Sequence, residues 1–163
     1  MHTTISTPAG PLTIVASGDA LLAAGFTAEV TELATDDPAP TGDGAGLEPI
    51  VKAVEAYFDG DLTAIDAVPV AQRGHGEFIG HAWDVLRAIP AGEPVTYTEY
   101  ARRAGRPGAV RAAAQACARN GAALFVPCHR VVRTDGTLGG YRWGIHVKQW
   151  LLAHEGRVPE TRS

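Results

Sequence analysis

The residues best suited to covalent chemistry are Cys128 and the histidine that follows it. A thiol is nucleophilic only as the thiolate, and a nearby imidazole can lower its pKa or take its proton. Because His129 is adjacent in sequence, a bridging water is an easier geometry than direct contact. A third group should orient the imidazole, as in catalytic triads, and Glu155 is the best candidate. A small buried thiol beside a core histidine explains the same residues, and on spacing alone both interpretations stay open.

The residues before Cys128 predict the backbone conformation at its position. A short apolar run, residues 122–126, leads into Pro127, which cannot continue a helix and forces the preceding residue into an extended conformation. We therefore expect Cys128 at the edge of a buried run, beside a rigid neighbour. Glu155 belongs to a later predicted helix whose apolar face carries Val147, Trp150 and Leu151.

Length and composition limit the classes of protein. The 163 residues fit one domain or two small ones, and 45% hydrophobic with 20% charged residues is ordinary for a globular protein. We find no apolar run of about 18 residues and no secretory signal, so we expect a cytoplasmic protein that is not membrane-bound. Two cysteines fit neither a disulfide framework nor a zinc pattern, and we expect Cys117 to be a packing residue.

The charge is unevenly distributed along the chain. Residues 1–76 carry two basic and eleven acidic residues, whereas residues 77–163 carry twelve basic and seven acidic ones. The two parts therefore have formal charges of −9 and +5, within a total of −4. A basic half on an acidic chain suggests that this half meets a polyanion, although segregation by accident is an equal alternative.

The first part, residues 1–76, reads as a small α/β unit. Short strands are expected around Ile5, at 12–15 and at 21–26, followed by an acidic loop over 28–46. The helical period of apolar residues over 47–58 predicts a helix that Gly60 ends. Residues 62–70 are interpreted as a further strand leading into a linker.

The second part, residues 77–163, reads as mainly helical. Phe78, Ala82, Val85, Leu86 and Ile89 are expected to line one face of a helix that ends before Pro90. Two short helices follow, at 96–104 and 109–119, joined by a tight turn over 105–108.

This pair of helices fits a helix-turn-helix, with Thr96 as the N-cap of its first helix. The second helix carries small alanines and, near its N-terminus, Arg111, whose charge opposes the helix dipole. A residue placed against its local preference suggests a function, with an ordinary surface arginine as the alternative.

The run Phe125–Val132 resembles the active-site motif of the O6-alkylguanine-DNA alkyltransferases. Residues 133–144 are similar to the version in the C-terminal half of the family's bacterial adaptive-response member. The resemblance covers residues 78–156 closely and the N-terminal part more loosely. It implies a small ribonuclease-H-like α/β domain with an antiparallel sheet and a helix, followed by a mainly α domain with the helix-turn-helix.

The resemblance also implies a reaction. The alkyl group of O6-alkylguanine in DNA, mainly methyl and with O4-alkylthymine as a further substrate, would pass irreversibly to Cys128, once per molecule. Glu155, His129 and a water would form the proton relay, Tyr97 would donate to the guanine ring, and Asn120 would tie the recognition helix to the active-site turn. The substrate pocket would be formed by Val131, Tyr141, Arg142 and Trp143.

For DNA, the resemblance implies that a monomer docks its helix-turn-helix in the minor groove of the duplex. Arg111 would enter the base stack where the damaged nucleotide leaves it, which is base flipping. Further DNA contacts would come from Thr96, Ala112 and Gln115. Displacement of an alkyl group needs no cofactor, and with no cysteine before Cys117 we expect no metal. Where relatives often have glutamine, this chain has Ile79.

Three other functions are weighed against this one. A non-catalytic alkylguanine-binding protein of the same fold would lack the cysteine, which is present here. A sequence-specific transcription regulator would need long polar side chains on the recognition helix, which offers few besides Gln115. A cysteine hydrolase would need an oxyanion hole, which the sequence does not indicate.

Overall fold

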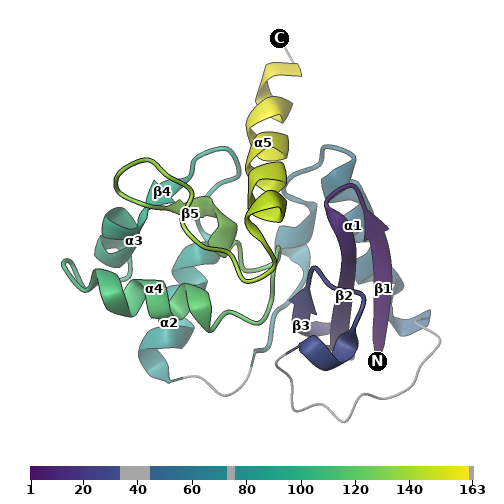
Figure 1. The fold of residues 1–163 in the computed structure, drawn as a ribbon. Helices are drawn as coiled ribbons and strands as arrows, with labels where there is room; N and C mark the ends of the chain where they lie inside the picture. Colours follow the sequence, from purple (N-terminus) through teal and green to yellow (C-terminus); the bar gives the residue numbers. More distant parts are fainter. Residues whose placement is uncertain (34–44, 73–75, 162–163) are drawn as a thin grey trace. The chain divides into compact units, whose positions relative to one another are not determined.

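The computed structural model describes residues 1–33, 45–72 and 76–161, and the chain divides into two compact units (Figure 1). The first unit comprises Met1–Gly74 and Gly121–Phe125, and the second comprises His75–Asn120 and Val126–Ser163. The segment 121–125 therefore belongs to the first unit, although the chain on both sides of it belongs to the second.

The first unit contains a three-stranded antiparallel sheet of β1 (His2–Thr7), β2 (Gly10–Ser17) and β3 (Ala20–Gly25), in that order. In this register Ile5 pairs with Leu12 on the neighbouring strand. The backbone reverses at Gly10 and Gly18, whose φ angles of 118° and 62° suit glycine. The three predicted strands are confirmed.

One helix, α1 (Glu48–Phe58), accompanies this sheet (Figure 1). Its inward stripe of Ile50, Val54 and Tyr57 is buried and follows the helical period. Gly60, with φ of 117°, lies just beyond the last turn. The predicted helix and its end are both confirmed.

Two expectations for this unit need correction. Residues 62–70 are not a strand, because they contain the 3₁₀ helix η3 (Ala64–Ala67) and only Val70 bridges to the sheet. The buried residues here, Ile65 and Val68, are three apart, which suits a helical turn rather than a strand. Of the expected acidic loop over 28–46, the parts at Val30–Glu32 and Ala45–Leu47 are short 3₁₀ helices (η1 and η2), and residues 34–44 lie outside the described residues.

In the second unit, α2 (Glu77–Arg87) packs against α3 (Tyr97–Arg103) and α4 (Val110–Ala118). Two buried hydrogen bonds join them: the Tyr100 hydroxyl donates to Ala82 O at 2.8 Å, and Trp83 Nε1 donates to Ala116 O at 2.9 Å. Because a buried donor needs a hydrogen-bond partner, these two bonds fix how the three helices pack against one another.

The helix α2 is confirmed, but its predicted face was partly wrong. Ile79 and Trp83 are buried with Ala82 and Leu86, while Phe78 and Val85 are only half-buried. Trp83 can be buried because its N–H finds a carbonyl on α4. Phe78 is covered differently, by the guanidinium of Arg106 at 4.2 Å from its ring centre.

The helix-turn-helix consists of α3, a turn and α4. Thr96 caps α3, since its hydroxyl accepts a hydrogen bond from Glu99 N at 3.1 Å, as predicted. The turn has left-handed glycines at Gly105 and Gly108, with φ of 87° and 84°. Just before α3, β4 (Val95–Thr96) pairs in parallel with β5 (Val131–Val132), which follows Cys128.

The last helix, α5 (Ile145–Thr161), buries charged side chains on one face. Lys148, Leu151 and Glu155 are fully buried, whereas Val147 and Trp150, predicted to be on the apolar face, are only half-buried. Among the α5 side chains that the structure describes, two of these three fully buried ones are thus ionisable. Such residues are seldom buried unless they are paired, so this face points to a polar site.

The glycines of the helix-turn-helix and of α5 predict stability changes of opposite sign. Gly105→Ala should destabilise the protein by about 1–2 kcal/mol, because alanine is strained at a positive φ although space for its methyl group is free. Gly156→Ala, also in open space but within a helix, should stabilise by about 0.5–1 kcal/mol. Urea unfolding midpoints measure both changes, and equal effects of the two variants would contradict the strain at Gly105.

Candidate active site

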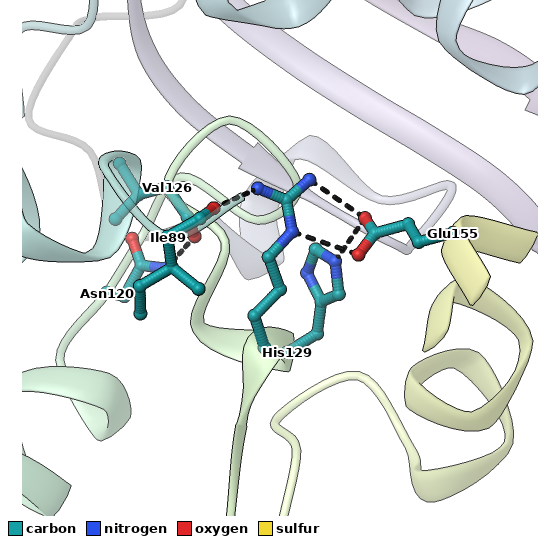
Figure 2. A network of polar contacts seen from close by, with 6 residues as sticks. Ile89, Asn120, Val126, His129 and Glu155 are labelled. Atoms are coloured by element: carbon teal, nitrogen blue, oxygen red, sulfur yellow. Dashed lines mark hydrogen bonds and ion pairs between the residues drawn. The ribbon is translucent and has the colours of Figure 1, made fainter. Parts of the chain in front are cut away.

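Cys128 begins a short 3₁₀ turn, η4 (Cys128–Arg130), directly after the buried residues 122–127. Pro127 precedes this turn, and Cys128 N donates to Val126 O at 2.8 Å. The same carbonyl accepts a hydrogen bond of 2.7 Å from Asn120 Nδ2, which follows α4 (Figure 2). The thiol is therefore held half-buried on a turn whose entry is fixed by proline and by the Asn120 amide.

The residues after Cys128 form a buried polar network with α5 (Figure 2). His129 Nε2 lies 2.7 Å from Glu155 Oε2. Arg130 donates from Nε to Glu155 Oε1 and from Nη2 to Oε2, both at 2.9 Å, and from Nη1 to Ile89 O at 2.7 Å. Glu155 thus orients the imidazole, as the sequence suggested, and Arg130 holds both of its oxygens.

The ionisation of this network follows from burial and charge. Burial alone would raise the pKa of Glu155, but its contacts with His129 and Arg130 outweigh burial and hold that pKa well below its usual range. Burial lowers the pKa of His129; Glu155 opposes this, and the charges of Arg130 and Lys148 add to it. At neutral pH the histidine is therefore neutral and the glutamate ionised.

The thiol of Cys128 is protonated at rest. Burial raises its pKa, while hydrogen bonding from Asn120 and the charge of Lys148 act in the opposite direction. His129 Nδ1 is buried and has no hydrogen-bond partner among the described residues. With Nε2–H directed to Glu155, this nitrogen carries the free lone pair, so the site pairs a protonated thiol with a neutral base.

Lys148 is a buried cation that sequence reasoning did not single out. Its ammonium donates to Val131 O at 2.8 Å and to Gly140 O at 3.3 Å. Burial lowers its pKa, and the negative charge of a Cys128 thiolate opposes that effect. Lys148 thus connects β5 to the loop that follows it and places a positive charge near the thiol.

Two of the residues expected to form the pocket lie near this cation or the thiol, since Val131 O accepts from Lys148 and Tyr141 interacts with Cys128. The backbone of Gly139 approaches both Tyr97 and Lys148, because a Cβ there would meet them at 3.4 and 3.7 Å. Burial, and then the charges of the two cysteines, raise the pKa of Tyr97 to about 12, so it remains a donor at neutral pH. The hydroxyl of Tyr141 is buried and has no hydrogen-bond partner among the described residues.

The loop before α5 carries the remaining pocket candidates. The guanidinium of Arg142 lies over the ring of Trp143, 4.6 Å from its centre. Trp143 is half-buried, and Val131 is fully buried on β5. Contact of Trp143 with an alkyl group stays a prediction.

The expected DNA-contacting residues lie along the helix-turn-helix. Arg111 and Gln115 are exposed on α4, one turn apart, and Ala112 beside them is half-buried. Thr96 uses its hydroxyl to cap α3. The exposed side of α4 therefore combines small side chains with one cation near its N-terminus.

The described part of the chain holds no group of three or more His, Cys, Asp or Glu side chains that could bind a metal ion. Among the described helices, none is long and apolar enough to cross a bilayer.

Comparison with known families gives two matches that together cover nearly the whole chain. Residues 1–72 match the ribonuclease-like domain of 6-O-methylguanine DNA methyltransferase, and residues 77–157 match the DNA-binding domain of the same family. The chain belongs to this methyltransferase family. The fold expected from the sequence, a ribonuclease-like α/β domain followed by a helical DNA-binding domain, is confirmed.

Individual members of the family show the same relationship. The chain is 38% identical to a Mycobacterium tuberculosis methylated-DNA–protein-cysteine methyltransferase over 97% of its own length and 94% of that protein. It is 50% identical to the Escherichia coli transcriptional activator and repair enzyme Ada over 57% of its length, which is 26% of Ada. A similar enzyme from Shigella flexneri is 45% identical over 61% of this chain, and the match spans 58% of that relative.

A solved structure is similar over almost the full chain. It is the crystal structure of the M. tuberculosis family member OGT in complex with DNA, with a TM-score of 0.84 and 36% identity. The match covers 96% of this chain and 93% of that one. The arrangement of elements described above is thus that of the methyltransferase family.

Two residues of the site, Arg130 and Lys148, were missed by sequence reasoning. Arg130 follows the predicted Cys–His pair and resembles any surface arginine until its burial is known. A weak signal existed for Lys148, which precedes Glu155 by seven residues and therefore lies on the same helix face.

The buried network predicts a large stability loss in Glu155→Gln. Arg130 would lose its counter-charge at a buried position, which typically costs about 3–5 kcal/mol. The matched control, Glu99→Gln, removes a solvent-exposed partner of Arg102 and Arg103 and should cost much less. Urea unfolding at pH 7 measures both, and equal losses would contradict the importance of burial.

The same variant should alter the dependence of stability on pH. The folded-state pKa of Glu155 is depressed, so its stabilisation is present above the unfolded value of 4.5 and is lost as the pH falls toward the folded value. Glu155→Gln should therefore lose less stability than the wild type on acidification below that value.

Proposed function

We propose that this protein repairs DNA by transferring the alkyl group of O6-alkylguanine, mainly methyl, irreversibly to Cys128. The observation that carries the proposal is the half-buried thiol next to a neutral histidine oriented by Glu155. Membership of the methyltransferase family and the helix-turn-helix on the same unit support it. O4-alkylthymine is a further proposed substrate.

The proposed reaction balances without a cofactor. The S–H bond of Cys128 breaks, and the proton passes to His129 Nδ1 through a water. The thiolate sulfur forms a bond to the alkyl carbon as the bond from that carbon to guanine O6 breaks. The guanine leaves with the bonding electrons and takes up one proton, which balances the proton released by Cys128, so the products are an S-alkylcysteine and guanine.

Several side chains would lower the barrier to this displacement. Lys148 supplies a positive charge near the developing thiolate, and Asn120 holds the turn that carries it. Tyr97 stays protonated and can donate to the leaving purine. Backbone groups at Cys128, Val131 and Arg142 would hold the base, with Tyr141 closing over it and Trp143 forming a wall of the alkyl pocket.

On DNA, we propose that a monomer places α4 in the minor groove of the duplex. Alanines on α4, including Ala112, permit close approach to the groove, and Gln115 and Thr96 would contact the DNA beside it. Arg111 would fill the space left by the flipped nucleotide. In this proposal residues 77–163, which carry a net positive charge, contact the DNA. Residues 1–76, which carry a net negative charge, form the supporting domain.

Intact protein mass before and after mixing with an O6-methylguanine duplex tests the function. We expect each molecule to replace one hydrogen by one methyl group, with the adduct on Cys128 and no second turnover. Cys128→Ser should show no adduct, because a hydroxyl is a far poorer nucleophile than a thiol, yet should still bind the duplex. Cys117→Ser is the matched control and should react as the wild type does. A methyl group on Cys117, or multiple turnover, would refute the proposal.

Arg111→Ala tests base flipping. Extruding a base costs a few kcal/mol in a paired duplex and less in a single strand, so the variant should lose roughly tenfold or more in rate on duplex relative to single-stranded substrate. The control, Arg119→Ala, changes an exposed arginine just beyond the other end of α4 and should affect both substrates alike. Equal losses for Arg111→Ala would make Arg111 an ordinary phosphate contact.

A further inference from the structure

Arg130 makes three hydrogen bonds within the site, and they reach two different residues. Its guanidinium donates to both oxygens of Glu155 and to the carbonyl of Ile89, just beyond α2. The side chain of Arg130 is 3% exposed and that of Glu155 is fully buried. A two-pronged contact of this kind fixes the plane of the carboxylate, which a single bond would leave free to rotate.

The guanidinium also changes the charge that His129 experiences. A buried imidazole paired with a lone carboxylate is favoured in its protonated form, because the opposite charge stabilises it. The charged groups facing His129 are Glu155 and Lys148 on α5 and Arg130 on its own turn, one negative and two positive. Burial raises the pKa values of the Cys128 thiol and the Tyr141 hydroxyl, so both are neutral at rest. Burial is the largest influence against an imidazolium, and the charges of Arg130 and Lys148 add to it by offsetting part of the opposing effect of Glu155.

We propose that Arg130 is a positioning residue that clamps Glu155 and cancels its charge, so that His129 rests as a neutral base with Nδ1 free to receive the proton of Cys128. This role rests on the proposed alkyl transfer. An imidazolium at rest could not accept that proton. With Arg130 in place, Nε2–H donates to Glu155 Oε2, and the unpartnered Nδ1 is the only ring nitrogen left to act as base.

The state of His129 can be read by nitrogen NMR of the imidazole rings in the unreacted protein, without any DNA. The wild type should show a neutral ring at pH 7 with the proton on Nε2. In Arg130→Gln the protonation midpoint of His129 should rise by about one pH unit or more, as expected when an adjacent cation is removed. Arg130→Lys keeps the charge but cannot bond both oxygens, so its midpoint should rise by less.

The matched control is Arg102→Gln, which removes an arginine from the exposed carboxylate of Glu99 and should leave the midpoint of His129 unchanged. If Arg130→Gln fails to fold, Arg130→Lys decides, and its midpoint must still exceed that of the wild type. An imidazolium in the wild type at pH 7, or folded variants with an unchanged midpoint, would overturn the proposal.

A second measurement connects this state to the reaction. The single-turnover rate of methyl transfer should fall on acidification at a higher pH in the Arg130 variants than in the wild type. A purely structural role for Arg130 would lower the rate without moving this pH. If the wild type transfers no methyl group at all, the proposed function fails, whereas the NMR result for Arg130 still stands or falls by itself.

Discussion

The carboxylate of Glu155 is buried, and its charge is balanced within the protein rather than by water. Its partners come from the turn that carries Cys128, and one of them, Arg130, also reaches the end of α2 through the carbonyl of Ile89. A buried charge of this kind permits only a few arrangements, because each misplaced partner leaves an unpaired ion. The orientation of the His129 imidazole follows from this one constraint.

The other parts of the site restrict the backbone that carries the Cys128 thiol. Pro127 restricts the backbone before the thiol, and Asn120 fixes the carbonyl of Val126. On the other side, Lys148 connects β5 to the Gly140 loop, and β5 is paired with the strand that leads into α3. The turn that carries Cys128 and the start of the helix-turn-helix are thus joined by backbone pairing within one unit.

Sequence reasoning succeeded where the structure is determined locally. The Thr96 cap, the glycine after α1 and the strand-and-turn pattern over 1–26 depend on neighbours within a few residues, and each was found. It failed where distant groups decide. The burial of Trp83, for example, depends on a carbonyl of α4.

The same contrast between local and distant determinants holds for the residues of the candidate site. Cys128, His129 and Glu155 could be named from residue type, spacing and family resemblance. Arg130 and Lys148 could not, because a buried cation is recognisable only once the groups that satisfy it are known. The DNA-contacting and pocket roles of the remaining residues stay proposals, since they concern a molecule other than this chain.

The segment 121–125 limits how the two halves of the chain, residues 1–76 and 77–163, could have evolved separately. Ala24 donates to Gly121 O at 2.9 Å and accepts from Ala123 N at 3.0 Å, so this short stretch extends the N-terminal sheet. It is also the only chain between Asn120 and the residues that introduce Cys128. A gene fragment encoding residues 77–163 alone would carry these backbone groups without their strand. The halves are therefore not interchangeable modules, and recombination at the linker would have to preserve the edge of β3 together with the residues that pair with it.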